Sequence, residues 1–309
     1  MSENSPHQQV VNFNSGGAED KLLLGIFLIA LGETCFIFMG VFVRQASEAI
    51  PLMQIMFFRN FFALFFVGYA VSKIGFSTLK SDHHKMHFLR AVVGITSMFF
   101  MVYSFSELKL SEATLLKALA PIMIPLIAWL VLGEKLGLLT WLAILLAFAG
   151  VAVIIASKDV SLSANLGFTA GITSAFLASL AKVIVRKLGS TDPSQVIVFY
   201  FAAYGTLITA PFCFWFWTEM SFTVWGLVFL CALAATGGQL FVTRAYTIAK
   251  AGRVGMFSYV SMPIAGILGW LIWSEKIPYS LVIGSLMIVA AGYLNYQEFK
   301  HAKKQVLSQ

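Results

Sequence analysis

Three charged residues, Glu33, Arg59 and Lys117, lie inside stretches that are otherwise apolar. Placing one charge in the centre of a bilayer costs about 2.5–3.5 kcal/mol on insertion scales, so such residues point to function or to a paired partner. Glu33 could take up and release a proton, because burial disfavours its charged form. It could instead face a cationic part of a ligand, or pair with a nearby arginine. We therefore treat it as a proton-coupling and substrate-binding candidate.

Arg59 and Glu33 are expected at similar depths, about 12 Å from the same membrane surface at 1.5 Å per residue. An ion pair between them would lower the cost of burying both charges. Direct contact of Arg59 with a substrate is the alternative. Arg244 lies near the end of its apolar stretch, so we expect it to reach the interface and contact lipid. Lys182 and Lys250 are interpreted as basic anchors outside the apolar layer.

Lys117 precedes Pro121 by four residues and shares a helix face with Thr114 and Pro125. Proline has no N–H, so it leaves the Lys117 carbonyl without its helical donor and kinks the helix. A cation beside a broken helix predicts a site for an anion or carboxylate. The alternative is that the long Lys117 side chain reaches the membrane interface.

Aromatic and small residues form a second group of candidates. Tyr259, Pro263 and Trp270 follow one another at helical spacing, and Tyr103 precedes the link to the Lys117 segment. Such rings could stack on a ligand or hold a cation, although packed or lipid-facing rings are the simpler interpretation. We expect Pro121, Pro263 and the adjacent pair Gly237 and Gly238 to permit kinks, close packing and gating movements.

The composition identifies the kind of molecule in which these residues act. The 309 residues are 59% hydrophobic and only 11% charged, whereas an ordinary soluble domain is about 25% charged. Ten apolar segments are each close to the ~20 residues that cross a bilayer as a helix. They are approximately 22–43, 51–73, 87–107, 111–132, 137–156, 165–186, 194–217, 222–247, 254–273 and 278–296. We predict an all-α integral membrane protein with ten transmembrane helices.

Lysine and arginine counts predict the orientation. With the N-terminus inside, the inner connections and helix ends carry 14 basic residues and the outer ones carry 4. Basic residues accumulate on the cytoplasmic side, so both termini are expected there. The formal charge of +7 then reflects topology rather than nucleic-acid binding.

Related patterns recur 141–142 residues apart. Lys117 precedes Pro121 as Tyr259 precedes Pro263, and both segments close on Glu-Lys. Five helices per half would place the halves in opposite senses, which is an inverted repeat typical of transporters. The predicted organisation is a disordered tail (1–20), a first repeat (21–157), a second repeat (163–297) and a C-terminal tail (298–309). Residues 33, 59 and 117 correspond to Ala175, Tyr200 and Tyr259, and this departure from symmetry favours them as substrate-binding residues.

The motifs and their order resemble the EamA family of the drug/metabolite transporter superfamily. The resemblance covers nearly all of 22–296 and rests on RAVVGITSMFFMVYSF at 90–105, WLVLGEK at 129–135, GGQLFVTRAY at 237–246 and YVSMP at 259–263. Two of these stretches are most similar to the group that includes bacterial S-adenosylmethionine and amino-acid or amine carriers. The resemblance implies a gating or structural role for Arg59, whereas Lys117 departs from the small or apolar residue of such relatives.

No enzyme, metal or cofactor motif is recognisable. Cys35, Cys213 and Cys231 are scattered through apolar runs, and we interpret His83, His84 and His87 as solvated loop residues rather than a metal site. We expect no cofactor and no nucleic-acid partner.

The predicted function is secondary active transport of a small polar metabolite across the bacterial inner (plasma) membrane. An amino acid, a derivative or a similar zwitterion or anion is the expected substrate, and alternating access is the expected mechanism. The partners are this substrate and the lipid bilayer. Helices 137–156 and 278–296 are expected to pair across the pseudo-two-fold axis or between two protomers as a homodimer. Alternatives are S-adenosylmethionine uptake, a membrane enzyme acting on lipid head groups and a non-transporting helper subunit.

Overall fold

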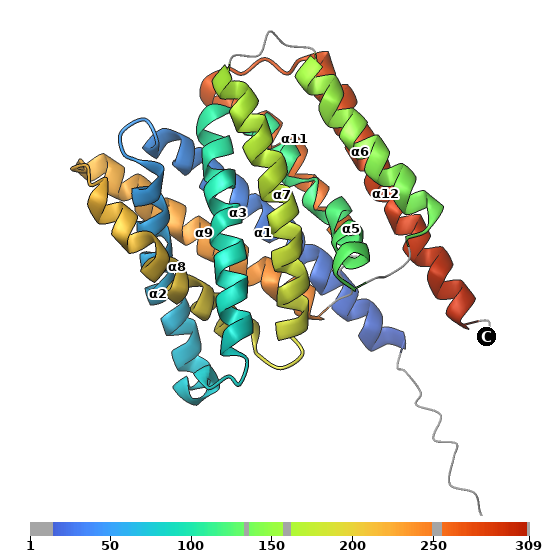
Figure 1. Ribbon diagram of the computed structural model, residues 1–309, viewed down its shortest axis with the longest axis horizontal. Coiled ribbons are helices and arrows are strands. Elements are labelled where there is room, and N and C mark those ends of the chain that lie inside the picture. Colours follow the sequence, from blue (N-terminus) through green and yellow to red (C-terminus); the bar gives the residue numbers. More distant parts are fainter. Residues whose placement is uncertain (1–14, 133–135, 157–161, 249–254, 308–309) are drawn as a thin grey trace, which may run out of the picture.

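The computed structural model describes residues 15–132, 136–156, 162–248 and 255–307, and within these ranges all regular structure is helical (Figure 1). The predicted all-α architecture is therefore confirmed. The described part of each predicted apolar segment is largely helical. Backbone N–H and C=O groups in lipid must be bonded within the protein, and a helix satisfies them inside a single segment.

The helices of the first half follow one another with short connections. They are α1 (Ser15–Ala46), α2 (Leu52–Ile74), η1 (Phe76–Leu79), α3 (His84–Glu107), α4 (Leu110–Lys117), α5 (Ala120–Leu132) and α6 (Leu138–Ala156).

The second half follows the same order. Its helices are α7 (Leu162–Leu188), α8 (Ser194–Trp215), α9 (Phe222–Ile248), η2 (Gly255–Val260), α11 (Ser261–Trp273) and α12 (Tyr279–Leu307). Pro51 precedes α2 and Pro193 precedes α8, so equivalent helices begin after a proline in both halves.

Both ends of the chain are more helical than predicted. Helix α1 already begins at Ser15, inside the segment expected to be a disordered tail, and α12 continues to Leu307. Residues 1–14 and 308–309 lie outside the described part of the chain.

Seven of the described helices are long and apolar enough to cross a membrane. The segments that fall short include 111–132 and 254–273, because each is divided. Helix α4 ends at Lys117, where the Leu119 N–H donates to the Leu116 carbonyl at 3.1 Å, and α5 begins at Ala120. In the second half the 3-10 helix η2 precedes α11. Pro121 and Pro263 lie just beyond these two breaks, so equivalent prolines accompany both.

The main helix pairs each combine one helix from each half. Helix α1 packs against α9, α3 against α7, α2 against α8, and α6 against α12, and Figure 1 shows the last pair along one edge of the bundle. A two-fold relation between the halves exchanges the α1–α9 pair with the α3–α7 pair and maps each of the other two onto itself. The pairing therefore supports two related halves, while the opposite senses of the halves stay a prediction.

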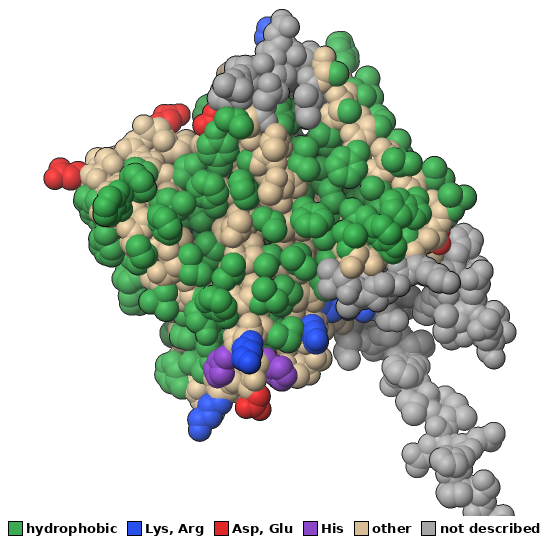
Figure 2. Space-filling view, viewed as in Figure 1, with side chains coloured by type: hydrophobic (Ala, Val, Ile, Leu, Met, Phe, Trp, Pro, Cys, Tyr) green, Lys and Arg blue, Asp and Glu red, His purple; other side chains and the backbone are tan. Residues whose placement is uncertain are grey.

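The outer surface suits a lipid environment. Figure 2 shows apolar side chains over most of the visible face, with basic and histidine side chains at the lower end, where the α2–α3 and α7–α8 connections lie in Figure 1. Leu145, Leu207 and Leu286 are among the large apolar residues that are more than half exposed. Together with the long apolar helices, this surface identifies a multi-pass membrane protein.

The α1–α9 contact is close because glycines meet there. A Cβ atom at Gly238 would lie 3.1 Å from the Gly32 carbonyl oxygen and 3.0 Å from the Phe36 ring. Small residues permit such approaches between membrane helices. The contact matters for the site because α1 and α9 both contribute residues to the central cavity described below.

We expect Gly238→Ala to destabilise the protein by about 1–3 kcal/mol, because the added methyl group overpacks the α1–α9 contact. The midpoint of thermal unfolding in detergent measures this effect. Gly226→Ala is the matched control, since it lies in the same helix with nothing within 4 Å of the added atom. Equal midpoints for the two variants would contradict the predicted close contact.

Candidate functional site

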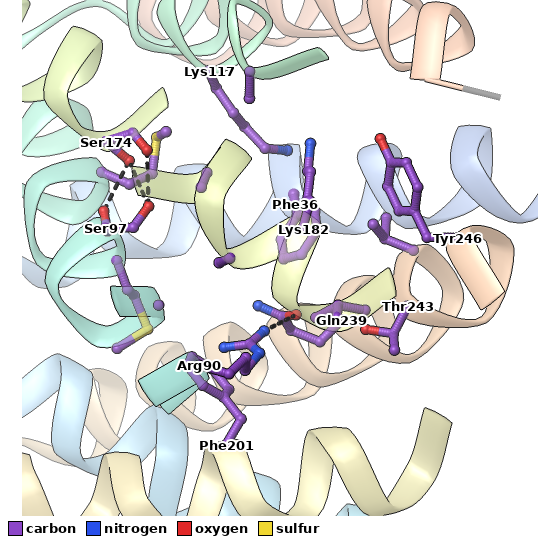
Figure 3. A pocket seen from close by; sticks show the side chains of 18 of the residues that line it. Phe36, Arg90, Ser97, Lys117, Ser174, Lys182, Phe201, Gln239, Thr243 and Tyr246 are labelled. Atoms are coloured by element: carbon purple, nitrogen blue, oxygen red, sulfur yellow. Dashed lines mark hydrogen bonds between the residues drawn. The ribbon is translucent and has the colours of Figure 1, made fainter. Parts of the chain in front are cut away.

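A cavity of about 140 Å³ lies in the centre of the bundle. Its lining residues come from α1, α2, α3, α4, α5, α7, α8 and α9, so both halves contribute. Helices α6 and α12 contribute none of these lining residues. Figure 3 shows polar side chains that point into the cavity from several of these helices. The site is thus assembled from segments that are far apart in the sequence.

One side of the cavity holds Glu33, Lys117 and Lys182, which we call the lysine cluster. The Lys117 ammonium donates a hydrogen bond to Glu33 Oε2 and forms an ion pair with it. Glu33 also attracts Lys182, whereas the two lysines repel each other. One carboxylate therefore faces two ammonium groups, and the cluster keeps an excess positive charge.

Aromatic rings support the two lysines. The Lys117 nitrogen lies 4.2 Å from the centre of the Phe36 ring, and the Lys182 nitrogen lies 5.5 Å from that of Tyr246. A cation within about 6 Å of a ring centre is attracted by the ring's electrons. Lys117 is also the last residue of α4. The partial negative charge at a helix C-terminus favours a cation there, so the break in the helix helps to place this ammonium group.

A second side of the cavity holds Arg59, Arg90 and Gln239, which we call the arginine cluster. Arg90 Nη2 donates to Gln239 Oε1 at 3.4 Å, and the Arg90 guanidinium carbon lies 3.8 Å from the centre of the Phe201 ring. Arg59 and Arg90 are only 3% and 5% exposed. Among the described residues, Nε and Nη1 of both arginines have no hydrogen-bond partner.

The arginine cluster is electrostatically incomplete. Arg59 and Arg90 repel each other, and no carboxylate among the cavity-lining residues belongs to this side. Buried donors without a partner cost free energy, more so when the group is charged. This arrangement can lower its energy by binding an anion.

The rest of the wall is small, weakly polar or flexible. Ser97 and Ser174 exchange hydrogen bonds across the α3–α7 contact, since each hydroxyl donates to the other residue's carbonyl, at 2.9 and 2.8 Å. Met39, Met98 and Met101 also line the cavity. Unbranched methionine side chains adapt to ligands of different shape.

The structure brings together three of the residues singled out in the sequence. Glu33, Arg59 and Lys117 all line this cavity. The predicted ion pair between Glu33 and Arg59 is wrong, because Glu33 pairs with Lys117. Lys117 points into the cavity rather than toward the interface (Figure 3).

The aromatic candidates lie elsewhere. Tyr259 is buried and its ring packs against Gly292 of α12. Trp270 is 60% exposed, and Tyr103 is half-buried. None of the three is among the cavity-lining residues, so their predicted contact with substrate receives no support from this geometry. Arg244 is exposed near the end of α9, as an interfacial residue should be.

Sequence reasoning missed Arg90, Lys182 and Gln239. From the sequence, Lys182 is interpreted as a basic anchor and Arg90 counts among the 14 basic residues of the inner connections and helix ends, yet both line the cavity. The repeat held a usable signal. Arg90 corresponds to Cys231 at an offset of 141, and Lys182 corresponds to Gly40 at an offset of 142. The departure from symmetry that favoured Lys117 therefore also marks these two bases.

The interpretation of the histidines needs a correction. His83 and His84 are exposed as expected, but His87 is fully buried. Its Nε2 lies 3.2 Å from the Ser81 hydroxyl and 3.7 Å from Asp192 Oδ2, and its ring centre lies 4.4 Å from that of Tyr200. Asp192 precedes α8, so these contacts tie the α2–α3 connection to the α7–α8 connection at one end of the bundle.

Comparison with known proteins agrees with this architecture. Residues 23–156 and 165–297 each match the model of the EamA-like transporter family. The chain is 29% identical to the pseudopaline exporter CntI of Pseudomonas aeruginosa over 88% of this chain and 95% of that protein. It is 21% identical to the S-adenosylmethionine uptake transporter of Rickettsia prowazekii over 87% of this chain and 91% of that one.

A solved crystal structure has the same fold. It superposes with a TM-score of 0.64 at 18% sequence identity and covers 89% of this chain and 96% of that one. At this identity the likeness concerns the fold alone.

We expect Glu33→Gln to destabilise the protein by about 3–5 kcal/mol, because it leaves two largely buried ammonium groups of the cavity wall, those of the half-buried residues Lys117 and Lys182, without a carboxylate. Adding Lys117→Met to this variant should restore part of the loss, since one of the two uncompensated charges is then gone. Thermal unfolding of the single and double variants measures the coupling. Lys187→Met, on the exposed part of α7, is the control. Purely additive losses would contradict the ion pair.

Proposed function

The chain belongs to the EamA-like transporter family, and from this we propose that it is a secondary carrier whose central cavity binds a small anionic or zwitterionic metabolite. The relatives are named exporters and uptake transporters, so the chain is a membrane transport protein rather than an enzyme. The observation that carries the substrate class is the charge of the cavity, where four basic side chains face a single carboxylate.

The position of the cavity supports alternating access. Carriers with inverted repeats bind substrate between the halves, and a movement of one half against the other exposes the site to either side. Here the cavity is lined from both halves, and the paired helices α6 and α12 lie outside it. We propose that α6 and α12 form the scaffold, and that the first repeat (21–157) and second repeat (163–297) move around the site.

Charged contacts at both ends of the bundle are suited to serve as gates. At one end the Arg44 side chain forms an ion pair with Glu275 and lies 4.3 Å over the Trp273 ring. At the other end His87, Asp192 and Tyr200 join two connections. Alternating access requires one of these two contacts to open while the other holds. The breaks beside Pro121 and Pro263 are the proposed places where helices move, whereas the glycine contact at Gly238 holds α9 close to α1.

A specific observation disfavours the uptake of S-adenosylmethionine. That molecule carries a sulfonium cation, and a cavity with an excess of positive charge repels it. The amino-acid-like part of a substrate remains suitable, because its carboxylate can reach a base and its amino group can reach Glu33.

Glu33 is also the proposed site of proton coupling. An acidic group that binds Lys117 competes with Glu33 for this ammonium group. Substrate binding then breaks the contact between Glu33 and Lys117. Substrate and proton binding would in this way be linked in one cavity.

The proposed location is the bacterial inner membrane, with both termini in the cytoplasm. The support is the imbalance of basic residues between the two sets of connections. The end that carries the exposed histidines and lysines of the α2–α3 connection would then face the cytoplasm.

Transport by the purified protein in liposomes tests the proposal. We expect uptake of acidic or zwitterionic metabolites from a mixed panel, with a rate that depends on an imposed pH gradient. Lys117→Ala and Glu33→Gln should each lower the rate at least tenfold, since each removes a charge from the binding site. Glu33→Gln should also remove the pH dependence.

Lys187→Gln is the matched control, because this exposed base lies outside the cavity on α7. Normal transport by both Lys117→Ala and Glu33→Gln would overturn the proposed position of the binding site. If no acidic or zwitterionic compound of the panel crosses the membrane under any gradient, the proposal that the protein is a carrier of such compounds is overturned.

A further inference from the structure

We propose that the cavity recognises a diacid, a small molecule whose two separated acidic groups are held by the lysine cluster and the arginine cluster. The acidic groups are carboxylates or phosphates, which share the chemistry that these side chains recognise. The inference rests on the proposed function, because it narrows the substrate class of the same cavity.

The first argument is the amount of charge. Arg59, Arg90, Lys117 and Lys182 line the cavity against Glu33 alone, which leaves an excess of three positive charges. A monocarboxylate would offset one of them, and an amino acid with a neutral side chain would bring no net charge. Because uncompensated charge is costly in a low-dielectric interior, a ligand with two negative charges is favoured.

The second argument is the arrangement. Figure 3 shows the ends of Lys117 and Lys182 beside each other, while Arg90 and Gln239 lie at another side of the cavity. The two clusters come from different helices, with lysines on α4 and α7 and arginines on α2 and α3. Among the described cavity-lining residues, no hydrogen bond or ion pair joins the two clusters. A single acidic group would serve one cluster and leave the other unpaired.

The third argument is the state of the arginine side chains. Both are more than nine-tenths buried, and two nitrogens of each lack a partner among the described residues. The planar guanidinium fork matches the paired oxygens of a carboxylate or phosphate. The arginine cluster is therefore suited to hold one acidic end. The second end then reaches the lysines, where it competes with Glu33.

Binding of matched pairs of compounds tests the inference directly. The pairs are glutamate with glutamine, aspartate with asparagine, succinate with succinamate and O-phosphoserine with serine, because each pair differs chiefly in one acidic group. We expect at least one diacid to bind the purified full-length protein roughly tenfold or more tightly than its partner, as expected for charge-assisted hydrogen bonds. Ligand-induced shifts in thermal unfolding measure binding, and counterflow in liposomes measures transport.

A variant at Lys182 tests the contribution of the lysine cluster separately from that of the arginine cluster. Lys182→Gln should lower the preference for the diacid over its partner by roughly tenfold, because the lysine cluster then has no excess charge. Lys187→Gln on the same helix should leave the preference unchanged. The unfolding midpoint without ligand shows whether each variant is folded. If Lys182→Gln does not fold, Lys182→Met takes its place.

The outcomes distinguish the inference from the proposed function. If monoacids or neutral amino acids bind and cross as well as every diacid, the diacid inference is overturned while the carrier remains. If diacids are preferred but Lys182→Gln keeps the full preference, the two-cluster model is wrong. If none of the eight compounds binds, the inference is likewise overturned, and the wider liposome panel decides on the carrier.

Discussion

The ion pair between Glu33 and Lys117 is the interaction on which the site depends. Both charges lie in the apolar centre of the bundle, and each lowers the cost of burying the other. The pair also links α1 to the point where α4 ends and α5 begins. A break in the helix, a proline that cannot continue the hydrogen-bond ladder and a buried carboxylate therefore act together. They hold one ammonium group in the cavity wall.

Symmetry explains the scaffold, and departures from it explain the chemistry. The α1–α9 and α3–α7 pairs correspond to each other in the two halves, and equivalent prolines follow the breaks at α4 and at η2. The charged residues of the cavity have no charged equivalent in the other half. A substrate is rarely symmetric, so a symmetric fold needs asymmetric side chains to recognise it. The buried arginines also lack charged equivalents, and their unpaired nitrogens support the proposed ligand site.

The bundle combines close helix packing with charged contacts at its two ends. Helices α6 and α12 approach closely, since a Cβ atom at Gly150 would lie 2.9 Å from the Gly284 carbonyl oxygen. The contacts at the two ends instead depend on ion pairs and hydrogen bonds, which can exchange with water when they open. This distribution suits a protein that keeps its fold while access to the centre changes sides.

Much of this protein could be determined from the sequence alone. Apolar segments of membrane length predicted the helical membrane fold, because the bilayer allows few other structures. The recurrence at 141–142 residues predicted two related halves, and the motif order indicated the transporter family. They also singled out Glu33, Arg59 and Lys117. Only the tertiary structure decided which charges meet. Depth along a helix can be estimated from sequence, but the direction in which a side chain points depends on packing between helices. For that reason Glu33 was paired with the wrong base, and Lys182 was interpreted as an anchor although it lines the cavity. Arg90 was not singled out, and Tyr259 and Trp270 were expected to contact a substrate in a cavity that they do not line.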